Sequence, residues 1–436
     1  MGNPDQQTAQ SQGELMDDSR EPGNLDDGGI PRVGSERVGR GGSGLGVPSS
    51  RIVPAARGVE AVDRVLASGT LSGNGSEVRA FEAECAEWLG ARDAVAVCSG
   101  TSALYLALSE YVRPGDRVIT SPISFFATVE AIMQAGAVPL FVDVNSRGQM
   151  DADAAVEAMR NEPGVTAICP VHMYGDMVDM DPITNCAAEM GIAVIEDACQ
   201  GHGAAYKKNA AGTLGDLGCM SFYATKHVTT LGEGGLITIP YGHPGRGTAQ
   251  RLRARRSHGM TGYSTHLLSG SNYRMSEAAA AYGREALAEF PAVQAERVRC
   301  SNGLWTAIGH DSSPFYTIPR PGEDVTHGFF WLPLLMSNKE LARQMRAHLL
   351  SCGIETRQRY TEPLQAQPVI RRAYGEEFVA AADAATPMAR RVAAGMIGLP
   401  TPANMTQEEF DRIVNGVWGF SGITPGGARH AESHAE

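Results

Sequence analysis

Residues 93–108 read DAVAVCSGTSALYLAL, and this stretch decides the fold class. Residues 93–99 are a short apolar run of the kind that forms a buried strand. Small and hydroxyl residues follow at Ser99–Ser102, where a helix can begin, and Leu104 and Leu108 then recur at helical spacing. A buried strand that turns directly into a helix is the repeating unit of an α/β sheet.

The same alternation of apolar strands and helices continues along the chain. We predict six further strands, at residues 116–122, 138–144, 166–172, 192–198, 218–225 and 235–239. Helices are predicted between several of them, for example over residues 125–136. Apolar strands separated by helices are typical of a mostly parallel sheet, here of seven strands, with helices on both faces. The predicted fold class is therefore α/β.

A different pattern begins near residue 300. Strands are predicted at 315–319, 328–336 and 354–360, and a helix over 337–353 with a capping box from Ser337 to Glu340. We therefore expect four parts: a disordered extension (1–49), a large domain (50–299), a smaller C-terminal α+β domain (300–423) and a flexible tail (424–436). The G-x-G-x-x-G match at residues 39–44 is not interpreted as a dinucleotide site, because no strand precedes it.

Composition and charge exclude several classes of function. The net charge is −12, whereas nucleic-acid binding requires a surplus of Lys and Arg. No apolar run is long enough to span a membrane, and the start of the chain does not resemble a signal peptide. The eight cysteines show no C-x-x-C pair, so we expect neither a metal site nor a redox motif, but reduced thiols in a cytoplasmic protein.

Three residue groups at predicted strand ends suggest a ligand site, because ligands of open α/β sheets bind beyond the carboxyl ends of the strands. The turn Ser99–Ser102 opens a helix whose amides could hold a phosphate, or it is simply a helix cap. Phe125 could stack on a flat ring, or it belongs to the core. Asp197 ends an apolar strand, where a carboxylate requires a partner: either a cap or a protonated ring nitrogen.

The fourth group is Lys226, which follows the apolar stretch SFYAT at residues 221–225. The chain has only four lysines, and the others are Lys207, Lys208 and Lys339. A desolvated lysine has a lowered pKa and can condense with an aldehyde. A phosphate cradle, a ring platform, an acid for a pyridine nitrogen and such a lysine together match pyridoxal 5′-phosphate (PLP).

Longer stretches in the same order resemble the DegT/StrS family of fold-type I PLP enzymes, which are mostly sugar aminotransferases. The resemblance runs from about Val53 to Pro368. It is carried by stretches that include SGTLSGNGSEVRAFEAECAEWLG, SGTSALYLAL, PISFFATVEAIMQAGAVPLFVDV, VIEDACQGHGA, GTLGDLGCMSFYATKH and GIETRQRYTEPLQAQP. It implies a PLP-dependent transfer of an amino group from glutamate, or less favourably glutamine, to a keto sugar, and the expected acceptor is a nucleotide-linked 4-keto or 3-keto sugar.

The family pattern also implies roles for individual residues. Lys226 would hold PLP and move protons, and Asp197 would pair with the pyridine nitrogen. The resemblance places the remaining cofactor contacts at Thr101, Ser102 and Ser221 for the phosphate, Phe125 for ring stacking and Gln200 for the ring hydroxyl. Asn272 would reach the phosphate of the other subunit, which implies a homodimer.

Some positions depart from the family pattern and leave alternatives open. His227 stands where the family usually has Asn, and Leu231 is an extra residue before GEGG. His172 could contact substrate or satisfy polar groups of the core, and His227 is expected to be a packing residue. A branch of the family replaces the lysine with His and is a dehydratase, whereas this chain keeps Lys226. The alternative functions are amination of a cyclitol or another secondary-metabolite ketone, and a non-catalytic PLP-binding regulatory role.

Overall fold

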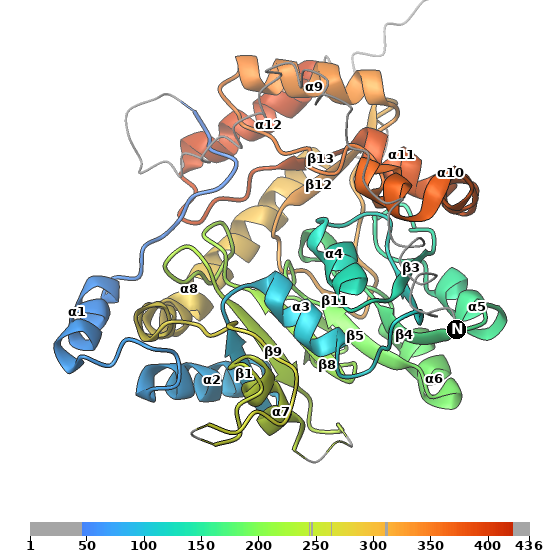
Figure 1. Cartoon of the computed structure of the whole chain (residues 1–436). Coiled ribbons are helices and arrows are strands. Elements are labelled where there is room, and N and C mark those ends of the chain that lie inside the picture. The colour runs from blue at the N-terminus through green and yellow to red at the C-terminus, as the bar shows by residue number, and fades with distance from the viewer. Residues whose placement is uncertain (1–45, 244, 246, 263, 310–312, 422–436) are drawn as a thin grey trace, which may run out of the picture. The chain divides into compact units, whose positions relative to one another are not determined.

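The computed structural model describes residues 46–421, except for residues 244, 246, 263 and 310–312 (Figure 1). The G-x-G-x-x-G match at 39–44 and the predicted tail 424–436 lie outside these residues. Residues 46–49 of the predicted N-terminal extension are described, and Val47 is fully buried and bridges Ile354.

A sheet of seven strands carries the fold, and its order is β1-β9-β8-β5-β4-β2-β3. The strands are β1 (Asp93–Val97), β2 (Arg117–Thr120), β3 (Val138–Phe141), β4 (Val165–Cys169), β5 (Ala193–Asp197), β8 (Leu217–Ser221) and β9 (Gly235–Ile239). Every pairing is parallel except the two that β9 makes with β8 and β1. The predicted mostly parallel seven-stranded α/β sheet is confirmed.

Helices cover both faces of this sheet (Figure 1). In β1, Ala94 and Ala96 pack on one face, while Val95 and Val97 pack on the other, as strand alternation requires. The first face meets α2 (Ser76–Leu89), α5 (Ala152–Asn161), α6 (Met180–Met190) and α8 (Glu277–Ile308). The second meets α3 (Gly100–Leu108), α4 (Ala127–Gln134) and α7 (Thr248–Arg255), so the sheet is buried on both sides.

The C-terminal part has its own antiparallel sheet and core. Its strands are β10 (Tyr316–Thr317), β12 (Leu332–Met336) and β13 (Met396–Leu399), in the order β10-β12-β13. Its helices are α9 (Lys339–Ser351), α10 (Pro368–Ala385), α11 (Pro387–Gly395) and α12 (Gln407–Ser421). The predicted boundary at residue 300 falls inside the 32-residue helix α8, and the division into two domains stays a prediction.

The remaining elements are short. They are α1 (Gly58–Ser68), the 3-10 turns η1 (Met173–Gly175) and η2 (Leu364–Ala366), and a small sheet of β6 (Ala205–Tyr206), β7 (Asn209–Ala210) and β11 (Val325–Thr326). No helix among the described residues is long and apolar enough to cross a membrane.

Three local predictions in the C-terminal part and in β8 are wrong. Residues 354–360 form no strand, because Ile354 and Arg357 each make only an isolated bridge, with Val47 and Gly398 respectively. The side chain of Asn338, not Ser337, caps α9, because it accepts from the amide of Leu341. Strand β8 ends at Ser221, so residues 222–225 lie outside it.

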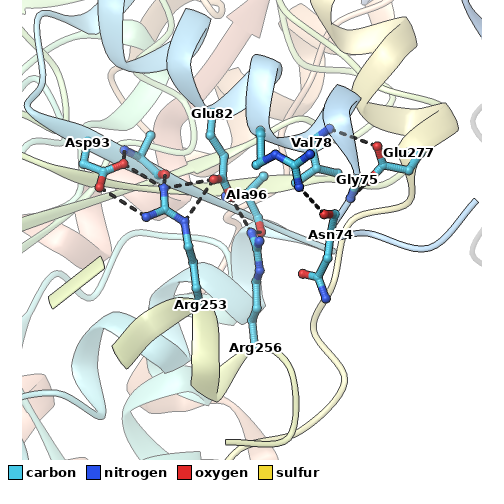
Figure 2. A network of polar contacts seen from close by, with 11 residues as sticks. Asn74, Gly75, Val78, Glu82, Asp93, Ala96, Arg253, Arg256 and Glu277 are labelled. Carbon is cyan, nitrogen blue, oxygen red and sulfur yellow. Dashed lines mark hydrogen bonds and ion pairs between the residues drawn. The ribbon is translucent and has the colours of Figure 1, made fainter. Parts of the chain in front are cut away.

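Figure 2 shows the polar network that ties α2 and α7 to β1. Glu82 of α2 is buried and binds the side chains of Arg253 and Arg256. Arg256 also donates to the carbonyl of Ala96 at 2.6 Å, and Arg253 reaches Asp93 at 2.8 Å. The buried charges of Glu82 and Arg256 each take part in at least two charge-assisted hydrogen bonds. The network therefore holds the end of α7 against β1. The segment after α7 leads to the predicted site residue Asn272.

Candidate active site

Asp197 is the last residue of β5 and is only 5% exposed. One carboxylate oxygen accepts a hydrogen bond from the hydroxyl of Thr128 at 2.7 Å, and the other accepts from the amide of Cys199 at 3.1 Å. These two donors come from the start of α4 and from the turn after β5. They hold the carboxylate in place and leave each oxygen with free acceptor capacity.

The neighbouring Glu196 points to the opposite face of β5, where it serves the structure. His172 lies 2.9 Å from Glu196 through Nε2, and both side chains are fully buried. The amides of Gly212, Leu214 and Gly215 donate to the same carboxylate at 2.6–2.9 Å. His172 is therefore bound within the core and turned away from Asp197, which supports the structural interpretation of this residue.

The start of α3 forms a narrow cradle beside the end of β8. Ser99 caps the helix by accepting from the amide of Ser102 at 3.1 Å. A side chain at Gly100 would place Cβ 2.7 Å from Cβ of Ser221 and 2.9 Å from Sγ of Cys199. In the register of the sheet, Gly235 of β9 pairs with Ser221. The hydroxyl of Ser221 and the first amides of α3 thus meet at one point, as an anion site requires.

Lys226 lies in the turn that follows β8 and not at the end of the strand. Its amide donates to the carbonyl of Tyr223 at 2.8 Å, and Nζ lies 4.7 Å from the centroid of the Phe330 ring. Burial lowers the pKa of its amine; the charge of Asp197 opposes this effect, and that of Arg357 adds to it. A lysine with a lowered pKa keeps a larger fraction of its amine neutral and nucleophilic.

Gln200 is buried, and both ends of its amide are already engaged. Its oxygen accepts from the amide of Tyr174 at 3.1 Å, and its nitrogen donates to the hydroxyl of Tyr360 at 2.8 Å. One N–H of this amide is left for a ligand. The contact with Tyr360 joins the site to the C-terminal part of the chain.

The two other predicted residues are exposed. Phe125, directly before α4, has 59% of its surface exposed, so it is not a core residue. Asn272 is exposed and forms a bridge with Ser257, and the next carbonyl, that of Tyr273, accepts from the amide of Cys98. The segment of Asn272 therefore runs beside the end of β1.

The C-terminal part contributes residues that the sequence analysis missed. A pocket next to Lys226 is lined by Arg297, Arg357, Phe330 and Trp331, with His227 beside them. Phe330 and Trp331 were predicted as strand residues, and the arginines looked like ordinary charged residues. No sequence signal marks them, because only packing of the two parts brings them to Lys226.

Comparison with known proteins identifies the family. Residues 55–418 match the model of the DegT/DnrJ/EryC1/StrS aminotransferase family. The chain belongs to this family. It is an aminotransferase with PLP as its cofactor, and the resemblance stated above is confirmed.

Individual relatives agree with this assignment. The chain is 32% identical over 344 residues to a UDP-N-acetyl-3-dehydro-alpha-D-glucosamine 3-aminotransferase of Acidithiobacillus ferrooxidans, covering 78% of this chain and 87% of the relative. It is 30% identical over 377 residues to the spore coat polysaccharide biosynthesis protein SpsC of Bacillus subtilis, covering 82% and 93%. The crystal structure of DesV from S. venezuelae, in complex with a ketimine intermediate, has a TM-score of 0.77 and 28% identity, covering 85% of this chain and 95% of DesV.

The residues present fit PLP. The α3 cradle admits no side chain at Gly100, the amine of Lys226 is partly desolvated, and the carboxylate of Asp197 is held by two donors. All three stand at the carboxyl edge of the sheet, where ligands of such folds bind.

Proposed function

We propose that this aminotransferase moves an amino group from glutamate to the ketone of a nucleotide-linked sugar, at its 3- or 4-position. The Acidithiobacillus relative, whose name gives a UDP-linked 3-dehydro sugar as its substrate, supports this substrate class. Glutamine is the less favoured donor. The observation that carries the proposal is the convergence of Lys226, Asp197 and the α3 cradle at one edge of the sheet.

The proposal assigns a role to each site residue. Thr101 and Ser102, at the start of α3, and the hydroxyl of Ser221 hold the phosphate of PLP, and the exposed ring of Phe125 covers the pyridine. Asp197 keeps the pyridine nitrogen protonated, so that PLP, when bound, supplies an electron sink. The remaining N–H of Gln200 binds the ring hydroxyl.

Lys226 has two tasks in the proposal. Its amine binds PLP covalently between turnovers, and once released it carries a proton between two carbon centres of the reacting group. The desolvation that lowers the pKa of Lys226 suits both tasks, because the neutral amine is the nucleophile and the base. His227 adjoins it but stays a packing residue, since burial holds the pKa of its imidazole well below the usual value.

Substitution of Lys226 by Ala tests the proposal. We expect borohydride reduction to fix PLP to Lys226 in the wild type, with the modified peptide identified by mass spectrometry. In Lys226→Ala this label should be absent, and amino transfer should fall by about 10²–10⁴-fold or more. A label on Lys207, Lys208 or Lys339 would contradict the assignment. A panel of keto sugar nucleotides and cyclitol ketones then separates the two acceptor classes.

The proposed active unit is a homodimer in which Asn272 binds the phosphate of the partner's cofactor. Exposed apolar side chains, Met260 and Leu267, lie on the same segment as Asn272. Mixing Lys226→Ala with Asn272→Ala subunits should restore activity to about a quarter of the wild-type level, since half of the dimers are mixed and each has one intact site. No recovery would place Asn272 in the site of its own subunit.

The proposal includes a cytoplasmic location, where nucleotide-linked sugars are made and thiols stay reduced. All eight cysteines are free, and five of them are buried.

A further inference from the structure

Arg357 is a buried cation without an anionic partner among the described residues. It is 7% exposed, and no hydrogen bond or ion pair of its guanidinium occurs within that part of the chain. Its backbone is fixed, because amide and carbonyl exchange hydrogen bonds with Gly398. Its charged group lies 5.3 Å from the centroid of the Trp331 ring. A cation–π contact of this kind contributes about 0.5–2 kcal/mol, less than the several kcal/mol that burial of an unpaired charge costs.

Arg297 is a second such cation in the same pocket. It is 8% exposed, and its only hydrogen bond within the described residues goes from one terminal nitrogen to the carbonyl of Thr401. Its Nε is buried without a partner. Burial lowers the pKa of Arg297 to about 10.

The two guanidinium groups, together with Lys226, line one pocket. The pocket is small: its volume of about 20 Å³ corresponds to room for about one water-sized group. The acid nearest to Arg357 in sequence, Glu355, is exposed and accepts from the amide of Ser49 instead. Positively charged side chains thus line a small space next to the amine that reacts.

We propose that Arg357, assisted by Arg297, binds a carboxylate of the amino-acid donor and thereby positions its amino group at Lys226. A planar guanidinium binds a carboxylate through two parallel hydrogen bonds, which fixes both distance and orientation. The ring of Trp331 orients the guanidinium group of Arg357 before the donor binds. The ketone acceptor, which has no carboxylate at its reacting carbon, does not use this pocket. The inference rests on the proposed function for the identity of its ligand.

The matched variants are Arg357→Gln, Arg357→Lys and Arg320→Gln. Arg320 is the control, because its guanidinium also lies over a tryptophan, 5.4 Å from the Trp305 ring, yet it does not line the pocket. Arg357→Lys keeps the buried charge without the fork. Urea unfolding of each variant shows whether its fold is retained.

The first measurement is calorimetric binding of glutarate, a dicarboxylate that cannot react. We expect Arg357→Gln to weaken glutarate binding by about 10- to 100-fold, as loss of a charged hydrogen-bonded pair predicts. Arg357→Lys should recover part of it, and Arg320→Gln should match the wild type. The titration is made with and without PLP, so its result depends neither on the acceptor nor on the label at Lys226. Equal affinity in the wild type and Arg357→Gln would overturn the inference.

The second measurement separates the two half-reactions. In Arg357→Gln the KM for glutamate should rise by a similar factor, while the amine-loaded enzyme should react with its ketone acceptor within about threefold of the wild-type rate. If both half-reactions slow equally, Arg357 supports the site as a whole and the inference fails. If Arg357→Gln does not fold, the same comparison is made with Arg357→Lys, where a rise in KM confined to glutamate is required.

Discussion

Gly100 is the residue at which the chain leaves no room for a side chain at the cofactor site. The first turn of α3 lies against Ser221 and Cys199, so an anion can approach the backbone of that turn closely. The sequence predicts this cradle, because small residues between a strand and a helix are a local signal. Asp197 and Lys226 were predicted from local signals too, since each follows or ends an apolar stretch.

Substitution of Gly100 by Ala tests the cradle. The new Cβ would lie 2.7 Å from that of Ser221, so α3 or β8 must shift, and overpacking of this kind costs about 1–3 kcal/mol. We expect the dissociation constant of PLP to rise about tenfold or more. Gly242→Ala is the control, since Gly242 is exposed and nothing lies within 4 Å of its added Cβ. Spectroscopic titration of the PLP-free proteins measures the effect, and equal affinity in the two variants would contradict it.

Arg357 had no such local signal. In the sequence it stands between polar residues, where a charge normally points to solvent. It is buried because its bridge to Gly398 draws residues 354–360 against β13, and because Trp331 packs on the same glycine. Those partners are more than 20 residues away in sequence, so the role could not be predicted from the segment itself.

At the scale of elements, the N-terminus of α2 is capped from another helix. Its N-cap residue, Gly75, has no side chain, and Glu277 of α8 accepts from the amides of Gly75 and Val78 (Figure 2). Glu277 also accepts from the amide of Glu77. Glu277 is 1% exposed. Its carboxylate both meets the free amides and complements the positive end of the helix.

Replacement of Glu277 by Ala should therefore destabilise the protein by about 3 kcal/mol, because one buried amide and two partly buried amides lose a charged acceptor. Urea unfolding measures this loss. Glu285→Ala, on the same helix, removes only a partly exposed ion pair with Arg64 and should cost less than about 1 kcal/mol. Similar losses in the two variants would show that the cap contributes little.

The strands of the large sheet and the helices around it could be predicted, because each has its own hydrophobic periodicity and its own terminating residues in the sequence. The end of β8 could not. The apolar residues after Ser221 continue the strand pattern, but the amide of Phe222 donates to Gly234 and its carbonyl accepts from Thr230, which turns the chain. That turn, made with residues further along, places Lys226 beside Phe330.

At the scale of the molecule, two neutral histidines are buried in separate parts of the chain. His202 and His327 each accept a backbone hydrogen bond through Nδ1, from Val228 and Phe329 respectively. Burial lowers the pKa of each to about 3. Both must therefore stay uncharged in the folded protein at neutral pH.

We therefore predict that the protein loses stability on acidification at pH values above those at which carboxylates titrate. Between pH 6.5 and 3 the unfolded chain binds protons at these histidines and the folded chain does not, so stability falls as pH falls. From pH 7.5 to pH 5 we expect a loss of about 2 kcal/mol for each histidine. Urea unfolding at the two pH values measures it. His327→Gln should reduce the loss, whereas substitution of the exposed His266 should not; an unchanged pH dependence in His327→Gln would contradict the assignment.

The sequence by itself determined the α/β sheet, the cofactor and the residues at the strand ends, because period, helix start and strand end are encoded within a few neighbouring positions. Only the tertiary structure decided where β8 ends and the turn with Lys226 begins. It also decided which helix caps α2 and which cations lie around the reacting amine. Those features arise from contacts between distant segments, and burial, rather than residue type, gives Arg297 and Arg357 their chemistry.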